Sequence, residues 1–339
     1  MSALFSIFLP VRNGQAYIKE CVGSILSQTF PGFELHVLDN ASTDKTVELV
    51  EEFRDSRIRV WRSNAPAALS IEENWSRMKG LPKNEFMTFL GHDDLYDPYF
   101  LETVKNLIER YPDASLYQTG FRLINARGRT IRSGSSIPER ETASRYLEER
   151  FSYRRDAVGT GFVMRSSDYD RLGGIPSFKK LLFADDALWL SLMKISWKAA
   201  DVKEAFSVRI HDQSVSSLPD WQSTIEGLGQ FSDFLKEFIR SDPDSAKVYH
   251  DFASAFFLRY HQSAYAYALL DACRHKMKID DSVFQKIGTS LIKTAARTGE
   301  DLRGSSKVRA LEILNGPFWR CHVDAILKFY YRLRTKSLW

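Results

Sequence analysis

This chain of 339 residues has few cysteines, few long apolar runs and a small net charge. Its three cysteines, Cys21, Cys273 and Cys321, are widely spaced, which fits neither a disulfide framework nor a zinc knuckle. No stretch reaches the ~20 apolar residues of a spanning helix, and the N-terminus lacks the basic start of a signal peptide. The net charge of +4 is small for a nucleic-acid-binding protein. We therefore expect a cytoplasmic protein that binds no nucleic acid.

Three common motifs are also missing, namely G-x-x-x-x-G-K-[ST], G-x-G-x-x-G and H-E-x-x-H. Their absence argues against P-loop enzymes, dinucleotide-binding folds with that fingerprint, and zinc proteases of that signature. Aromatic residues, in contrast, are abundant, with 23 Phe, 14 Tyr and 7 Trp. A chain so rich in aromatic side chains is globular rather than disordered.

The first third of the chain alternates between apolar runs and helical segments. Strands are predicted over 4–11, 34–38, 58–62 and 86–90, and helices over 16–26, 41–53, 70–79 and 97–111. Ser70 and Glu73 form a capping box, and Asp97-Pro98 is typical of a helix start. Strands separated by single helices indicate an α/β fold with a mostly parallel sheet flanked by helices.

Polar clusters follow three of these strands. Arg12-Asn13 comes after the first strand, Asp39-Asn40 after the second, and His92-Asp93-Asp94 after the fourth. In open parallel sheets, ligands bind beyond the carboxyl ends of the strands. We therefore expect the three clusters to meet at one edge of the sheet.

The rest of the chain divides into a mixed middle and a helical end. Strands over 116–124 and 162–164, a turn at 127–128, a helix cap at Ser166 and a helix over 184–196 are predicted in the middle. From Trp221 onward apolar residues repeat at helical spacing; they include Ile225, Leu228, Leu235, Phe238, Tyr249, Phe252, Phe256, Tyr260, Val283, Ile287 and Leu291. We predict a domain of strands and helices over 1–218 and an all-helical region over 219–339.

Two pairs of adjacent carboxylates stand out. Asp93-Asp94 follows a strand, where oxygen ligands suit Mg²⁺ or Mn²⁺ shared with a substrate's phosphates. Asp185-Asp186 lies in the first turn of a helix, where the helix dipole favours negative charge. Each pair also has a simpler interpretation, as a solvated turn and as a helix-stabilising pair.

Several motifs together carry a family resemblance. They are Pro10-Val11-Arg12-Asn13-Gly14, Val37-Leu38-Asp39-Asn40-Ala41-Ser42-Thr43-Asp44, Phe89-Leu90-Gly91-His92-Asp93-Asp94, Asp185-Asp186 with Leu188-Trp189-Leu190, and Arg209-Ile210-His211. In order and spacing the chain resembles the family 2 glycosyltransferases of the GT-A fold, of the bacterial polysaccharide type, over about residues 4–215. The resemblance therefore leaves the helical end uncovered.

The resemblance implies that the domain over 1–218 is a catalytic domain with a nucleotide-sugar donor site. Pro10, Arg12 and Asn13 would border the nucleotide. Asp39 matches the carboxylate that accepts a hydrogen bond from the base, typically uracil. We therefore expect a nucleotide-diphosphate sugar, in particular a UDP-sugar, as the donor.

The resemblance also assigns the chemistry. Asp93 matches the last Asp of the DxD element and would bind Mn²⁺ or Mg²⁺, with Asp94 assisting through the metal or the sugar. His211 would provide a further metal or diphosphate contact, with Arg209 beside it. Asp186 matches the general base. A single in-line displacement aided by this base would invert the anomeric configuration.

The sequence departs from the family pattern at three positions. Gly91 replaces the first Asp of DxD, Asp185 replaces the usual Glu before the base, and Arg12 replaces a common Tyr. Gly91 keeps open the alternative of a catalytically degenerate sugar-nucleotide or glycan-binding module. A sugar nucleotidyltransferase is disfavoured, because such enzymes carry a Gly-rich, basic loop after the first strand.

The family setting suggests a glycan or lipid-linked glycan acceptor in surface polysaccharide synthesis. A basic amphipathic stripe over 318–339 would suit contact with the inner face of the cell membrane, or packing on its own domain, or a homo-oligomer contact. Gly159-Thr160-Gly161 is interpreted either as a segment near the acceptor or as a turn before a strand. Trp75 and Trp189 are expected in the core.

Overall fold

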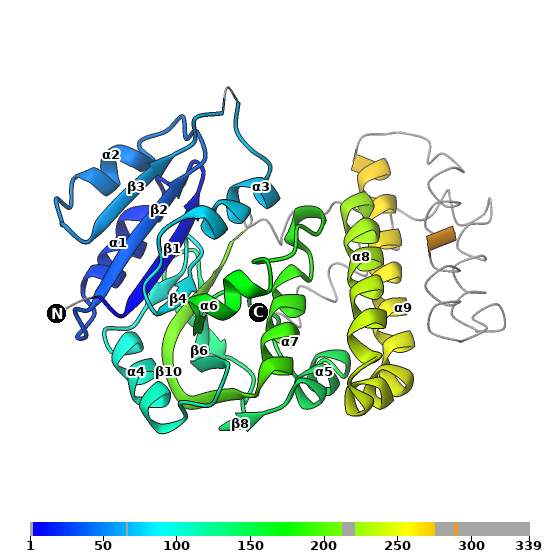
Figure 1. Cartoon of the computed structure of the whole chain (residues 1–339). Coiled ribbons are helices and arrows are strands. Elements are labelled where there is room, and N and C mark those ends of the chain that lie inside the picture. The colour runs from blue at the N-terminus through cyan, green and yellow to red at the C-terminus, as the bar shows by residue number, and fades with distance from the viewer. Residues whose placement is uncertain (1–2, 66, 212–220, 275–288, 291–339) are drawn as a thin grey trace.

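The structure is a computed structural model that describes residues 3–65, 67–211, 221–274 and 289–290. One sheet, flanked by helices, forms its centre (Figure 1). The strands are β1 (Phe5–Val11), β2 (Phe33–Asp39), β3 (Ile58–Arg62), β4 (Phe86–Phe89), β5 (Leu95–Tyr96), β6 (Leu116–Asn125), β7 (Thr130–Ser133), β8 (Arg140–Glu141), β9 (Phe162–Arg165) and β10 (Lys198–Ile210). The helices are α1 (Ile18–Leu26), α2 (Thr46–Glu51), α3 (Ile71–Ser76), α4 (Phe100–Arg110), α5 (Ala143–Phe151), α6 (Ser166–Arg171), α7 (Ala184–Ile195), α8 (Trp221–Ile239) and α9 (Pro243–Arg274), with 3-10 turns η1 (Arg77–Gly80) and η2 (Lys179–Leu181).

The sheet combines a parallel half and a mixed half. Its strand order is β3-β2-β1-β4-β9-β6-β10-β5, with β7 beside β6 and β8 beside β10. The strands β1 to β4 run parallel, as predicted. The pair β6–β10 is also parallel, whereas β9, β5, β7 and β8 run antiparallel to their neighbours. The α/β class is confirmed, and parallel pairing is confined to the first four strands and one later pair.

The carboxyl ends of β1, β2 and β4 meet at one edge of the sheet. β1 lies between β2 and β4, with Val11 opposite Asp39 and Phe8 opposite Phe89. All seven residues of β1 are buried, as expected for a parallel strand that is covered on both faces. The chain crosses from one side of β1 to the other after β3, which is the kind of switch point where α/β sheets bind ligands.

Local helix signals were only partly reliable. The capping box at the start of α3 is present. Asp97 does not cap α4, because that helix begins after Tyr99 and the Asp97 carboxylate pairs instead with Arg122 on β6. Ser166 is the first residue of α6 rather than its cap, and its hydroxyl donates to the carbonyl of Asn84. In both cases a partner distant in sequence takes the side chain that would cap the helix.

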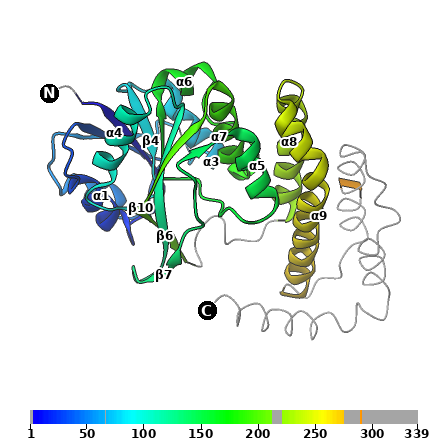
Figure 2. The same cartoon turned by 90° about the horizontal axis from the view of Figure 1, so that it is seen from below.

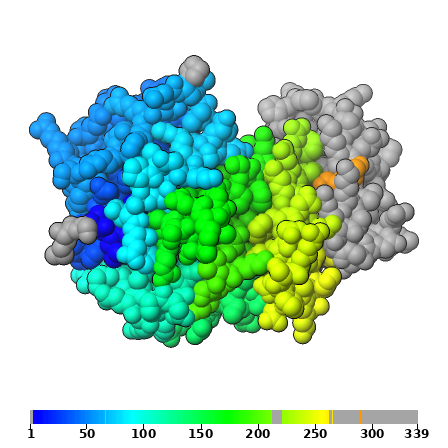
Figure 3. All heavy atoms as spheres, in the orientation of Figure 1, coloured from blue at the N-terminus to red at the C-terminus, as the bar shows by residue number. Residues whose placement is uncertain are grey.

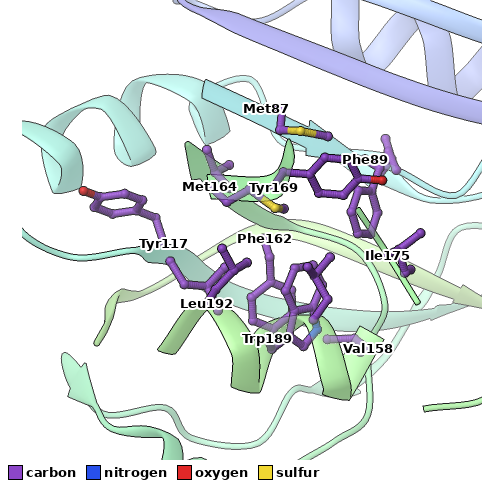
Figure 4. Close-up of a cluster of buried hydrophobic side chains, with 14 of the residues drawn as sticks. Met87, Phe89, Tyr117, Val158, Phe162, Met164, Tyr169, Ile175, Trp189 and Leu192 are labelled. Carbon is purple, nitrogen blue, oxygen red and sulfur yellow. The ribbon is translucent and has the colours of Figure 1, made fainter. Parts of the chain in front are cut away.

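Helix α7 is anchored by an aromatic stack in the core (Figure 4). Trp189 is fully buried, as expected. Its ring stacks on Phe162 of β9 with centroids 4.3 Å apart and on Phe89 of β4 with centroids 5.5 Å apart. The stack fixes α7 against the end of β4 and the start of β9, and so helps to position Asp185 and Asp186 at the N-terminus of the helix.

The helices α8 and α9 lie side by side, on the side of the described structure remote from α1 and α2 (Figures 1 and 2). Phe231 of α8 stacks on Phe183 with centroids 5.0 Å apart. Phe256 of α9 lies 4.6 Å from the Phe151 ring of α5. These side chains belong to the same buried hydrophobic cluster as those of the sheet. The space-filling view shows the yellow surface of the two helices continuous with the green surface of the middle of the chain (Figure 3). The predicted helical character is confirmed as far as Arg274.

Other predictions concern segments outside the described residues. They include the boundary near 218, the helical spacing of Val283, Ile287 and Leu291, and the basic stripe over 318–339. Within the described residues, no helix combines the length and the apolarity that crossing a membrane requires.

The Trp189 stack gives a prediction about stability. Trp189→Ala removes a fully buried ring and should lower the free energy of unfolding by about 3–5 kcal/mol. The matched control is Ile195→Ala on the same helix, since Ile195 is 40% exposed and its loss should cost under about 1 kcal/mol. Urea denaturation followed by circular dichroism measures both. Equal losses in the two variants would show that the stack does not anchor α7.

Candidate active site

The loops after β1 and β2 are joined by hydrogen bonds. The Asn13 backbone N–H donates to the Ser42 hydroxyl over 2.9 Å, and the Asn13 amide oxygen accepts from the Thr43 N–H over 2.8 Å. The Gly14 N–H donates to the Thr46 hydroxyl over 2.8 Å. Asn13 has a φ of 52°, a left-handed conformation that Asn tolerates well. The Asn13 side chain therefore shapes the loops, and its predicted contact with the nucleotide stays a prediction.

Asp39 ends β2 as a buried side chain, 4% exposed. Its Oδ1 accepts from the Ser42 N–H over 3.2 Å. Its backbone carbonyl accepts from the Ser63 N–H and from the Arg77 guanidinium, each over 3.0 Å. Among the described residues, Oδ2 accepts no hydrogen bond, so this oxygen has capacity for a ligand donor.

Pro10 and Arg12 differ in position. Pro10 is buried within β1, opposite Leu38, while the Arg12 side chain is exposed beyond the end of that strand. The neighbouring Asn40 is buried and exchanges two hydrogen bonds of 2.8 Å with the backbone of Leu69. Asn40 thereby ties the chain after β3 to the end of β2, beside Asp39.

Asp93 and His211 form the most accessible polar pair at the end of β4. Asp93 Oδ2 lies 2.8 Å from His211 Nε2, and the two side chains are 17% and 9% exposed. Gly91 permits this arrangement, because a Cβ there would lie 2.8 Å from Asp93 Oδ1 and 2.9 Å from Asp94 Oδ2. In this arrangement the Asp93 and Asp94 carboxylates fold back over residue 91, into the space that a side chain there would take.

Asp94 is buried and fully engaged within the protein. Its Oδ2 accepts from the Thr160 hydroxyl over 2.9 Å, and its Oδ1 accepts from the Arg209 backbone N–H over 2.9 Å. Burial, together with the neighbouring Asp93 carboxylate, raises the pKa of Asp94 to about 7. These contacts make Asp94 a link between β4, β10 and the segment before β9.

Arg209 is likewise enclosed, with a side chain 1% exposed. Its guanidinium donates to Glu20 over 2.7 Å and to the Asp93 carbonyl over 2.8 Å, and it lies 4.7 Å from the centre of the Tyr17 ring. The Tyr17 ring in turn lies 4.9 Å from that of His211. Arg209 thus supports the Asp93–His211 pair from behind rather than facing a ligand.

Asp186 is held in a closed ion pair. The Arg150 guanidinium donates from Nε to Oδ1 over 2.7 Å and from Nη2 to Oδ2 over 2.6 Å. The Tyr146 hydroxyl also donates to Oδ1, over 2.7 Å. The Asp186 and Arg150 side chains are each 6% exposed.

The adjacent Asp185 has quite different surroundings. It is half-buried, and among the described residues no other side chain hydrogen-bonds to its carboxylate. A Cβ at Gly159 would lie 3.2 Å from its Oδ2. Burial, together with the Asp186 carboxylate, raises the pKa of Asp185 to about 7, against the opposing effect of the Arg150 guanidinium.

The segment 159–160 brings the two carboxylate pairs together. Gly159 faces Asp185, and the next residue, Thr160, hydrogen-bonds to Asp94. Neighbouring Cα atoms are about 3.8 Å apart. The residues after the end of β4 and the first turn of α7 therefore meet at the same short segment. Of the two interpretations of this segment, the structure shows a tight connection ahead of β9 that also lines the site.

The residues present fit a divalent cation in part. In the part of the chain that the structure describes, no group of three or more His, Cys, Asp or Glu side chains is arranged to hold a metal ion. Asp93 and His211 supply two adjacent donors. Mg²⁺ and Mn²⁺ in phosphate-transfer sites commonly take one or two protein ligands and complete their shell with phosphate and water. Two protein donors therefore suffice for a cation that arrives with a diphosphate.

The sequence analysis missed the partners of these acids. Arg150 and Tyr146 come from α5, a helix that was not predicted. A signal was present, because Thr142 caps that helix and accepts from the Arg145 N–H. The spacing of four residues between Tyr146 and Arg150 also places both on one helix face.

The comparisons with known proteins point to one family. The model described as Glycosyl transferase family 2 matches residues 6–173. An uncharacterized glycosyltransferase of Rickettsia prowazekii is 24% identical over 313 residues, which cover 88% of this chain and 93% of that protein. TuaG of Bacillus subtilis, whose name refers to teichuronic acid biosynthesis, is 28% identical over 220 residues, covering 63% of this chain and 82% of that protein.

Solved structures show the same fold. Residues 1–349 of S. aureus TarS, crystallised with UDP-GlcNAc, align with a TM-score of 0.54 and 16% identity, over 88% of this chain and 92% of that chain. A second TarS structure aligns with a TM-score of 0.56 and 17% identity, over 76% of this chain and 43% of that chain. The family match spans the ends of β1, β2 and β4, where the resemblance placed the donor site. The chain therefore belongs to glycosyl transferase family 2, has the GT-A fold, and is a glycosyltransferase.

Proposed function

We propose that the protein is an inverting, divalent-metal-dependent glycosyltransferase that moves a sugar from a UDP-sugar to a hydroxyl of a glycan or glycolipid. The observation that carries this proposal is the convergence of Asp94, the neighbour of Asp93, and Asp185 of α7 on the segment 159–160. The ends of β4 and β2 lie at the same edge of the sheet. Surface polysaccharide synthesis on the cytoplasmic side of the membrane is the proposed setting, in keeping with the name of TuaG.

A uracil nucleotide suits the surroundings of Asp39. The N3–H of uracil is a hydrogen-bond donor, and Asp39 Oδ2 has acceptor capacity within a buried site. The structural neighbour TarS was crystallised with UDP-GlcNAc. Both observations support UDP as the nucleotide.

Asp93 and His211 would hold the cation beside the diphosphate. When bound, a divalent cation neutralises the charge that builds on the leaving diphosphate. Arg209 holds the backbone carbonyl of Asp93, and the Tyr17 ring packs against that of His211. Asp94 accepts from the backbone N–H of Arg209 and so fixes the chain next to them. The chain thus positions the donor through contacts that exist before any ligand binds.

A carboxylate at the N-terminus of α7 would take the proton from the acceptor hydroxyl. The resemblance assigns this role to Asp186. The acceptor oxygen attacks the anomeric carbon from the face opposite the diphosphate, so that one displacement inverts the configuration and no covalent intermediate is required. Helix α9 borders this side of the site, because the ring of Tyr260 lies 5.0 Å from that of Phe183, the residue before α7. We propose that the predicted helical region over 219–339 contributes to acceptor binding.

The alternative function, a catalytically degenerate sugar-nucleotide or glycan-binding module, was suggested by Gly91 in place of the first Asp of DxD. The Asp93 and Asp94 carboxylates occupy the space that a side chain at residue 91 would take, which supports a packing role for Gly91 in the site. We therefore favour the catalytic proposal.

The metal assignment predicts a change in UDP binding. Asp93→Asn should abolish the gain in UDP affinity that Mn²⁺ confers over EDTA, a gain of at least about tenfold, or 1.4 kcal/mol, in the wild type. Isothermal titration with UDP measures it. Asp251→Asn is the isosteric control, since Asp251 is exposed on α9. An undiminished Mn²⁺ effect in Asp93→Asn would contradict the assignment.

The base-recognition assignment makes a separate prediction. Asp39→Asn removes a charged acceptor, and hydrogen bonds to charged groups contribute about 1.5–3 kcal/mol. The dissociation constant of UDP should therefore rise by about tenfold or more, and the preference for UDP over CDP should disappear. Titration of both nucleotides in Mn²⁺ tests this. If the variant retains the wild-type preference, the base is recognised elsewhere.

A further inference from the structure

The residues that lead into α7 have an unusual backbone. Lys180, Leu181 and Phe183 have φ angles of 51°, 56° and 63°, all in the left-handed region. L-residues with a large side chain rarely adopt this conformation, because their Cβ atom comes too close to the following carbonyl oxygen. Strained backbone of this kind persists only where the surrounding structure holds it, and it gathers at functional sites. We call residues 179–183 the strap.

Two side chains from different parts of the fold hold the beginning of the strap. Glu72 of α3 accepts a hydrogen bond from the Lys180 backbone N–H over 2.6 Å. Gln230 of α8 accepts one from the Lys179 backbone N–H over 2.7 Å. Since two consecutive backbone groups are bound by two different helices, the strap is fixed between α3 and α8.

The end of the strap is packed closely against α8. A Cβ at Gly227 of that helix would lie 2.8 Å from the Cβ of Leu182, so a larger residue at 227 would force the two segments apart. Gly in the interior of a helix lowers its stability. Helix α8 therefore contains an unfavourable residue at the point where it meets the strap. The ring of Phe183 is stacked on that of Phe231, one turn further along α8.

Helix α3 belongs to the nucleotide side of the site. Arg77, the residue after this helix, donates to the backbone carbonyl of Asp39 over 3.0 Å. Glu72 extends this connection to the strap, and the strap runs directly into α7, whose second and third residues are Asp185 and Asp186. A continuous series of contacts therefore joins the end of β2 to the two acids.

We propose that Glu72 and Gln230 are positioning residues of this glycosyltransferase. By holding the strap in its left-handed conformation, they set the start of α7, and with it the acids of that helix, against the segment 159–160. The proposal rests on the function proposed above. A displacement of about 1 Å at a catalytic group can lower the rate about 10²-fold. The two residues should therefore affect kcat rather than the affinity for UDP.

The first test asks whether the strap is held against its own preference. Lys180→Gly and Lys180→Ala both remove the lysine side chain, so the difference between them reports the backbone alone. Gly adopts the left-handed conformation freely, and Lys180→Gly should unfold at a temperature higher than Lys180→Ala by about 1 °C or more. The neighbouring Lys179 has a φ outside the left-handed region, so there the Gly variant should be the less stable of the two. Scanning calorimetry of the full chain measures all four.

The second test asks whether the strap serves catalysis. It uses the slow hydrolysis of donor, in which water takes the place of the acceptor. Release of UDP from UDP-GlcNAc, UDP-glucose and UDP-galactose is followed with Mn²⁺, well below the unfolding temperature of each variant. Glu72→Ala and Gln230→Leu should each lose about tenfold or more in kcat, while their dissociation constants for UDP stay within about twofold of that of the wild type.

Conservative variants separate a positioning role from a general loss of stability. Glu72→Gln and Gln230→Glu keep a side-chain oxygen that accepts from the strap, and each should retain at least about half of the wild-type kcat. Glu48→Ala is the control for removal of a glutamate, since Glu48 is exposed on α2, and it should match the wild type in rate and in UDP binding.

Three results would overturn the proposal, and they are distinguishable. If Lys180→Gly is no more stable than Lys180→Ala, the strap is not held in a strained conformation. If folded Glu72→Ala and Gln230→Leu hydrolyse donor at the wild-type rate, the two residues do not position the acids, and the proposed function stands. If the wild type releases no UDP from any of the three donors, the proposed function falls, and the positioning role falls with it.

Discussion

A buried carboxylate, that of Asp94, holds the candidate site together. Its two oxygens accept from the Thr160 hydroxyl and from the Arg209 backbone N–H, and so it joins the end of β4 to β10 and to the segment before β9. A buried charge is costly unless it is hydrogen-bonded, which strongly disfavours arrangements that break these contacts. Everything proposed about catalysis depends on this link, because it sets Asp93 and His211 beside the segment that Asp185 faces.

The same division of roles occurs in both carboxylate pairs. In the first pair, Asp94 is buried and bonded within the protein, while Asp93 is more accessible. In the second pair, Asp186 is buried against Arg150, while Asp185 has no side-chain partner among the described residues. One acid of each pair is hydrogen-bonded within the protein, and its neighbour is left for a ligand. Adjacent residues can divide in this way because consecutive side chains point in different directions from a turn or from a helix.

Much of the fold was predictable because its signals are local. The strands β1 to β4 are continuous apolar runs, and the capping box of α3 lies within four residues. In the mixed half, β6 and β9 were predicted but β10 was not, because β10 begins with a fully buried Lys198 whose pairing partner Glu141 lies far away in the sequence. For the site, the motifs gave the right strand ends. They could not show which acid of each pair is engaged, because that depends on Arg150, Tyr146 and Thr160, which belong to segments distant from the acids that they contact.

The account claims that one crevice holds a cation at Asp93 and His211 and a free carboxylate at Asp185. The most direct measurement is a crystal structure of the full chain soaked with UDP and Mn²⁺, with anomalous diffraction to locate the manganese. We predict an anomalous peak within bonding distance of Asp93 and His211. We also predict that the uracil lies at Asp39 and that the side of the diphosphate away from the manganese faces Asp185. A manganese peak bound elsewhere, or UDP bound away from the carboxyl ends of β1, β2 and β4, would contradict the account.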